Sequence, residues 1–108
     1  MMPISIVPRT DDVDVYLVLD DLRTQGRIWR EMDEEMANAA AIIEWIADGH
    51  FDRPVRIVAF NLHEGWSKDV TEDIAQELLL ASREGRVLGT AAREFVERVT
   101  GQAATIIV

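Results

Sequence analysis

The pattern of apolar and polar positions along the chain predicts three β-strands. Segment 13–20, VDVYLVLD, is β-branched and apolar on both faces, which is typical of a central strand. Segment 27–32, RIWREM, alternates strictly, so we expect a second strand that pairs with the first as a hairpin. Its outward side carries Arg27, Trp29 and Glu31. VRIVAF at 55–60 predicts a third strand, which Pro54 begins.

Three other stretches repeat their apolar residues with the period of an α-helix. The first begins at Asp33 as N-cap and ends at Gly49. Its apolar stripe comprises Met36, Ala39, Ala40, Ile43, Ile46 and Ala47, widened by Ile42 and Trp45. The second helix is expected at about 70–84 and the third at about 91–100, and residues 61–69 are expected to form a loop.

The resulting element order is β-β-α-β-α-α, which indicates an α/β or α+β fold. We expect a small mixed sheet of three to four strands with the helices packed on it. The third strand is placed beside the first, which gives the strand order 2-1-3. The organisation is an irregular N-terminal arm at 1–12, one globular domain at 13–101 and an apolar tail at 102–108.

Composition and charge narrow the classes of function. The chain has 108 residues, no Cys and a net charge of −9, so one domain without disulfides or thiol chemistry is expected. Such an acidic surface repels phosphate backbones, which disfavours nucleic acids and anionic membranes as partners and favours basic proteins or cations. Wholly apolar runs reach five residues, too short for a membrane helix, and the N-terminus does not resemble a secretory signal. We therefore expect a soluble, cytoplasmic protein.

Four blocks of sequence carry a resemblance to known proteins. In order they are YLVLDD, GRIWREMDEE, RPVRIVAFN and EGWSKDVTEDIAQEL, and the likeness covers roughly residues 13–100. Together they resemble a set of small bacterial proteins without a known activity. Leu22 stands where those proteins often have Phe, and Leu62–His63 where they often have Thr-Ala. The resemblance implies a cytoplasmic bacterial protein and supplies neither catalytic residues nor a cofactor.

Acidic residues at the end of the first strand are a candidate metal site. Asp20 and Asp21 supply carboxylate oxygens of the kind that Mg²⁺ or Mn²⁺ prefers. Hairpin pairing sets Asp20 near Arg27 and leaves Glu31 more than about 10 Å away, too far for one metal to bridge. Two interpretations stay open: a metal-assisted hydrolase that uses Asp20 and Asp21, or a solvated turn with an Asp20–Arg27 or Asp21–Arg23 ion pair.

The expected loop at 61–69 is a candidate ligand-binding site, because it leaves a strand and enters a helix N-terminus. Its candidate residues are Asn61, His63, Trp66, Ser67 and Lys68. The loop has neither a nucleophile elbow nor phosphate-loop spacing. The alternative is that Asn61 and Ser67 satisfy backbone groups while Trp66 packs under the loop. The two histidines, His50 and His63, lack metal-ligand spacing.

Exposed apolar edges are the third candidate. Trp29 faces outward on the second strand, and the tail ends in Ile106, Ile107 and Val108. Edges of this kind need to be covered, and a homodimer or a different protein partner achieves that. Our first hypothesis is therefore a non-catalytic interaction or regulatory module that forms a homodimer. The alternatives are a small-ligand-binding domain that uses 61–69 and the metal-assisted hydrolase.

Overall fold

The computed structural model describes residues 14–32, 38–61 and 63–104. The expectations for 1–12, for Asp33 and Met36 and for Ile106, Ile107 and Val108 lie outside these residues. The described chain forms an α+β fold with one four-stranded sheet and three α-helices. The strands are β1 (Val15–Asp21), β2 (Arg27–Glu31), β3 (Pro54–Asn61) and β4 (Trp66–Asp69). The helices are α2 (Ala39–Ala47), α3 (Thr71–Arg83) and α4 (Thr90–Thr100).

The strand order is β2-β1-β3-β4, so the expected placement of the third strand beside the first is confirmed. Every described pairing is antiparallel, whereas a mixed sheet was expected. The reason is that the connection through α2 carries the chain from β2 across β1. Strand β3 therefore runs parallel to β2 but lies beside β1, and parallel strands are never neighbours here.

The hairpin register differs by one residue from the expected one. Asp21 lies opposite Arg27, and Asp20 lies opposite Ile28. A single 3₁₀ turn (Arg23–Gln25) lengthens the connection between the strands, and the Leu22 N–H donates to the Gly26 carbonyl at 2.8 Å. Because neighbouring residues of a strand point to opposite faces, this shift sends Asp20 and Arg27 to different sides of the sheet.

Strand β4 lies inside the segment that was expected to be a loop. Its four residues pair with the end of β3, from Asn61 opposite Trp66 to Val58 opposite Asp69. It is short, each of its four residues is exposed and three of them are polar, so it shows neither the apolar alternation nor the length that marks a strand in a sequence. The prediction of a loop at 61–69 was therefore wrong for residues 66–69.

Helix boundaries depend on local hydrogen bonds. Helix α2 begins after Asn38, whose side-chain oxygen accepts from the Ala41 N–H at 2.8 Å. Helix α4 begins after Gly89 and ends at Gly101, which has the left-handed conformation expected of a helix C-terminus. Ala104 is buried, although the domain was expected to end at 101.

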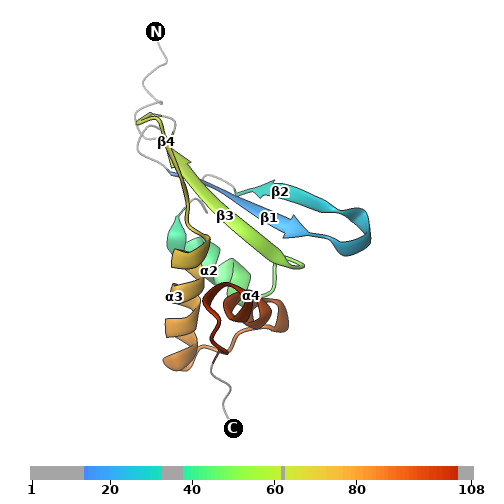
Figure 1. Ribbon diagram of the computed structural model, residues 1–108. Helices are drawn as coiled ribbons and strands as arrows, with labels where there is room; N and C mark the ends of the chain where they lie inside the picture. The colour runs from blue at the N-terminus through green and yellow to red at the C-terminus, as the bar shows by residue number, and fades with distance from the viewer. Residues whose placement is uncertain (1–13, 33–37, 62, 105–108) are drawn as a thin grey trace.

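The three helices cover one face of the sheet, and the β1–β2 hairpin projects beyond them (Figure 1). Alternate residues of β1 are buried: Tyr16, Val18 and Asp20. The core between the two layers is apolar, with Ile42, Ile46, Ile57, Leu78, Leu79, Phe95 and Val96 almost fully buried. Within the described part of the chain, no helix combines the length and the apolar character that crossing a membrane requires.

Candidate functional site

Asp20 is a buried carboxylate that ties two parts of the fold together. Its side chain is fully inaccessible to solvent. Oδ2 accepts hydrogen bonds from Arg30 Nη1 at 2.9 Å and from the Asp52 N–H at 3.1 Å, and Oδ1 accepts from the Arg53 N–H at 2.7 Å. The guanidinium of Arg30 also lies over the Phe51 ring, 5.3 Å from its centroid. Asp20 therefore joins edge strand β2 to the bend that precedes β3.

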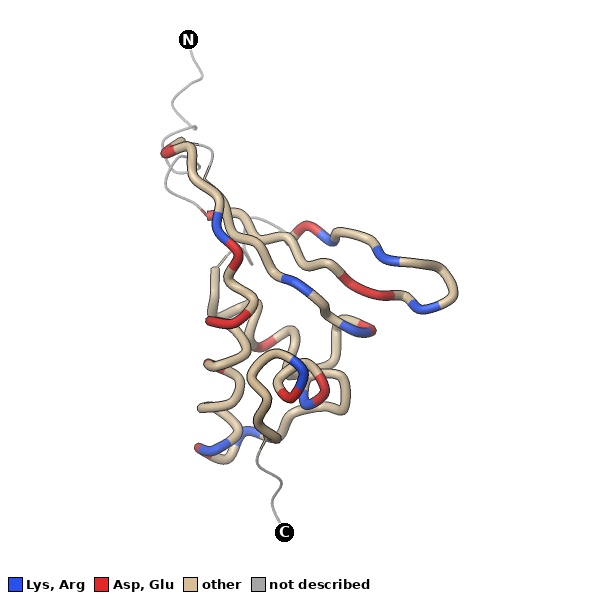
Figure 2. The backbone as a smooth tube through the Cα atoms, viewed as in Figure 1, with Lys and Arg blue, Asp and Glu red and all other residues tan. Residues whose placement is uncertain are grey.

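Asp21 begins a chain of alternating charges at the same end of the sheet. Its Oδ2 lies 4.0 Å from Arg27 Nε and 3.6 Å from Arg53 Nη1, and its Oδ1 accepts from the Arg23 N–H at 2.8 Å. Glu94 continues the chain, since its Oε1 lies 3.1 Å from Arg53 Nε and 3.8 Å from Arg98 Nη1. Figure 2 shows acidic and basic positions side by side along this hairpin.

These two aspartates occupy different environments. Asp20 faces the helices, while Asp21 lies on the opposite face of the sheet beside arginines. Among the described residues, no three His, Asp or Glu side chains come together as a metal-binding group. Glu31 lies opposite Leu17, about 10 Å along β1 from Asp20. A metal-binding role for Asp20 and Asp21 remains a prediction.

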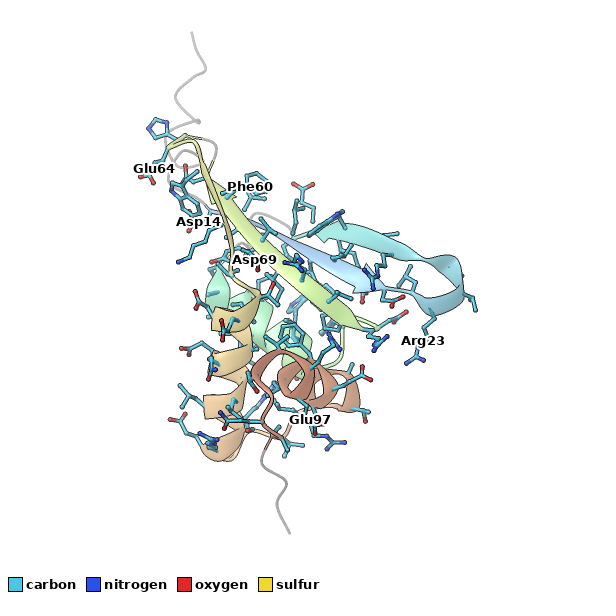
Figure 3. The ribbon with its side chains drawn as sticks, viewed as in Figure 1. Asp14, Arg23, Phe60, Glu64, Asp69 and Glu97 are labelled. Carbon is cyan, nitrogen blue, oxygen red and sulfur yellow. The ribbon has the colours of Figure 1, made fainter. Side chains whose placement is uncertain are left out.

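Asn61 and residues 63–69 lie at the other end of the sheet, where Glu64 marks the β3–β4 turn far from Arg23 of the hairpin (Figure 3). Asn61 is buried, and it organises this turn. Its Oδ1 accepts from the Glu64 N–H at 2.8 Å, and its Nδ2 donates to Asp14 Oδ1 at 3.1 Å. As the alternative interpretation expected, Asn61 satisfies a backbone group of the turn.

Two other candidate residues of this segment, Trp66 and Lys68, contact separate partners. Trp66 donates from Nε1 to Glu64 Oε1 at 2.7 Å, and Lys68 Nζ lies 3.8 Å from Asp73 Oδ2. His63 and Ser67 are exposed on the turn and on β4. A binding role for these residues stays a prediction.

The outer edge of β2 is free within the described sheet, and its hydrogen-bonding groups can be assigned. The Met32 N–H donates to the Tyr16 carbonyl and the Leu22 N–H to the Gly26 carbonyl. Hydrogen-bonded pairs therefore fall on alternate residues of the β1–β2 ladder. The backbone N–H and C=O groups of Ile28 and Arg30 point toward β1. The N–H and C=O groups of the intervening residues point outward: Arg27, Trp29 and Glu31.

The side chains on this edge are partly apolar. Trp29 is 49% exposed and Ile28 is 44% exposed, which makes them two of the most exposed large apolar residues described. Trp29 lies opposite Leu19 on the face of the sheet that is remote from the helices. The structure thus places Trp29 where the sequence predicted it, in the middle of an edge strand between Arg27 and Glu31.

A cavity between α2 and α3 was not expected from the sequence. Its volume is about 620 Å³, within the range of ligand pockets. The described residues that line it are Tyr16, Ala39, Ala40, Ile43, Val70, Asp73, Ile74, Gln76 and Glu77. The exposed alanines at the start of α2 were the available signal, because they belong to an apolar helix stripe yet are too small to fill the space beside α3.

Comparisons with known proteins add no assignment: no protein-family model, curated protein or solved structure matches this chain. The site must therefore be interpreted from its own geometry, and the resemblance of the four sequence blocks remains a prediction.

Proposed function

We propose that this protein is a non-catalytic interaction module that forms a homodimer by pairing the β2 strands of two copies. The observation that carries the proposal is the outer edge of β2, which is unpaired within the described part of the chain and on which Arg27, Trp29 and Glu31 direct their N–H and C=O groups outward. Unpaired groups of this kind form a template for another strand. Exposed Trp29 supplies apolar surface at the centre of the edge.

The sequence of β2 suits antiparallel pairing with itself. A twofold axis at Trp29 sets this residue opposite its copy and sets Arg27 opposite Glu31 of the second copy. All three residues have outward-facing backbone groups, so each pair exchanges both of its N–H···O bonds. The two symmetry-related Arg–Glu pairs each contribute about 0.2–1 kcal/mol, as opposite charges do across strands.

The dimer is expected to be weak and dependent on concentration, because one five-residue strand buries less surface than a standard interface. The net charge of −9 on each copy opposes association at long range. Salt at about 0.15 M screens that repulsion beyond roughly 8 Å and leaves contacts across the strands in place. A cytoplasmic location belongs to the same proposal, and the acidic charge favours protein rather than nucleic acid as partner.

A charge swap tests the proposed register. Arg27→Glu sets two carboxylates opposite each other at both ends of the pairing, and Glu31→Arg sets two guanidinium groups there. Each single variant is expected to be monomeric, while the double variant restores opposite charges and hence the dimer. Sedimentation equilibrium from micromolar to about 1 mM protein measures the result.

Trp66→Lys on β4 is the matched control for Trp29→Lys on β2, because both replace an exposed tryptophan on an edge strand. We expect dimer loss with Trp29→Lys and none with Trp66→Lys. A wild-type protein that remains monomeric throughout the concentration range contradicts the proposal. A double Arg27→Glu, Glu31→Arg variant that stays monomeric, while the wild type dimerises, would reject the register centred on Trp29.

A further inference from the structure

The cavity between α2 and α3 has a shape that suits side chains from a helix. One wall comes from α3 and its N-cap: Val70, Asp73, Ile74 and Glu77 lie at the i, i+3, i+4 and i+7 positions of one helix face, and Gln76 lies beside them. This wall extends for about 10 Å along the helix axis. The α2 wall consists of Ala39, Ala40 and Ile43. The two small alanines leave the groove wide enough to accept side chains from a third helix.

The floor and the rim of the groove differ in chemistry. Ile74 is buried, and Ile43 and Val70 are partly buried, so the floor is apolar. Asp73 and Glu77 are exposed at the rim. An occupant therefore needs apolar side chains to fill the groove and positive charge to face the rim.

Tyr16 adds a polar group from the sheet. Burial, together with the nearby Asp14 carboxylate, raises the pKa of the Tyr16 phenol above its usual value. The phenol therefore stays protonated at neutral pH and keeps a hydroxyl donor.

Lys68 Nζ lies 3.8 Å from Asp73 Oδ2, but both side chains are about two-thirds exposed, so an incoming cation can replace this weak contact.

From this complementarity we propose that the groove binds a basic amphipathic helix of a partner protein. Apolar side chains at helical spacing enter between α2 and α3, as in other helix-in-groove complexes. Lys or Arg side chains flanking that stripe pair with Asp73 and Glu77. The net charge of −9 steers a basic partner to this surface and repels an acidic one. The groove uses no residue of β2, so this proposal and the proposed homodimer can fail separately.

Three synthetic peptides test the chemistry of the occupant by titration calorimetry. The first has about 15 residues, near the length below which isolated helices are marginal, with Leu at i, i+3, i+4 and i+7 and Lys elsewhere. In the second peptide Glu replaces Lys, and in the third Ser replaces Leu. We expect the Leu/Lys peptide to bind the wild-type protein and the other two not to bind.

Protein variants locate the binding site. Asp73→Asn combined with Glu77→Gln is expected to weaken binding of the Leu/Lys peptide about fivefold, as partly exposed charge pairs do. The matched control combines Glu72→Gln with Glu84→Gln, which removes the same charge from α3 and its C-cap, outside the groove. Ala40→Gln fills the groove with a longer side chain and should abolish binding, while Ala103→Gln at an exposed position outside it should not.

Each alternative outcome has a distinct meaning. Equal losses in the two double variants would show attraction by overall charge alone and overturn the proposal. Full binding to Ala40→Gln, with its fold confirmed by thermal unfolding, would place the peptide elsewhere and also overturn it. Binding of the Ser/Lys peptide as tight as that of the Leu/Lys peptide would remove the apolar groove from the interaction.

Discussion

The two edges of the sheet differ in how far they are open to another strand. Strand β2 has three residues with outward-facing backbone groups, and its side chains include exposed Trp29 and Ile28. Strand β4 has four exposed residues, WSKD. The Val70 N–H donates to the Ile57 carbonyl, and hydrogen-bonded pairs alternate along an antiparallel ladder. On β4 the backbone groups of Ser67 and Asp69 therefore point outward.

The difference between the two edges follows from the contacts that each strand makes outside its own ladder. Strand β4 passes through Val70 directly into α3, and Asp69 turns its carboxylate back to the Thr71 N–H at 2.9 Å. A short edge with Lys and Asp is a common protection against strand addition. Strand β2 is instead held from its inner side, by Arg30 on buried Asp20. One edge is thus protected by its own sequence, and the other is anchored while its outer side is unpaired among the described residues.

Removing the anchor of β2 should have the largest effect on stability. Asp20→Ala leaves the Arg30 guanidinium and the N–H groups of Asp52 and Arg53 without their acceptor. We expect a loss of about 3 kcal/mol in the free energy of unfolding, because the variant loses three hydrogen bonds to a buried carboxylate, each contributing about 1 kcal/mol, while the partly exposed Arg30 regains water. Urea denaturation monitored by tryptophan fluorescence measures it.

The matching change on the other edge is Asp69→Ala, which removes an exposed carboxylate and should cost about 1 kcal/mol or less. Hydrogen exchange adds a local readout, since Asp20→Ala should lower protection in β2 more than in β4. If Asp20→Ala and Asp69→Ala lowered the free energy of unfolding equally, the distinction between an anchored β2 edge and a protected β4 edge would be contradicted.

Proline substitution separates the inner and outer sides of β2. The Ile28 N–H faces β1, so Ile28→Pro removes a ladder hydrogen bond and is expected to cost about 2 kcal/mol. The Trp29 N–H faces outward, so Trp29→Pro should cost less than about 1 kcal/mol in the monomer, as proline is tolerated on edges. Thermal unfolding compares the two proteins, with Ile28→Ala and Trp29→Ala as side-chain controls.

The same pair also addresses the proposed dimer. Trp29→Pro should give a folded monomer, because it removes a donor from the centre of the pairing. A larger loss of stability for Trp29→Pro than for Ile28→Pro, after subtraction of the alanine controls, would show that the assigned hydrogen-bonding alternation is wrong.

Much of the fold could be predicted because periodicity reports burial. The segments that became β1, β3, α3 and α4 carry continuous apolar stretches or strong helical stripes. Strand β4 could not be predicted, because its pairing depends on β3 and not on apolar residues of its own. The start of α2 at Ala39 depends on one hydrogen bond, which the Asn38 side chain accepts from the Ala41 N–H, and several nearby residues carry an equally suitable acceptor.

The candidate site shows the same limit. The placement of Trp29 follows from strict alternation, which the sequence displays directly. The burial of Asp20 does not, because its environment is set by Asp52 and Arg53, more than 30 positions away, and by a one-residue change in the hairpin register. The α2–α3 groove depends on how two helices pack, which their separate stripes do not specify.

The smallest expected effect concerns the pH dependence of the β4 edge. Burial alone would raise the pKa of Asp69, but hydrogen bonds from the Thr71 hydroxyl and N–H and from Arg56 outweigh it and hold this pKa below its usual value. A carboxyl group with a lowered pKa in the folded state stabilises the protein above its unfolded pKa of about 3.9, and this contribution disappears as the pH falls through the folded value.

Wild type and Asp69→Asn should therefore differ at pH 7, and the difference should shrink below about pH 3.9 and disappear below the folded pKa of Asp69. The difference at pH 7 should be at most about 1 kcal/mol, since the side chain is 43% exposed and solvent screens its charge interactions. Arg56→Gln serves as the control, because loss of the guanidinium should move the pKa of Asp69 upward in an NMR titration. A constant difference between wild type and Asp69→Asn from acid to neutral pH would mean that Asp69 acts on β4 through shape and neutral hydrogen bonds. The protection of this edge would then rest on the short length of β4 and not on its charge.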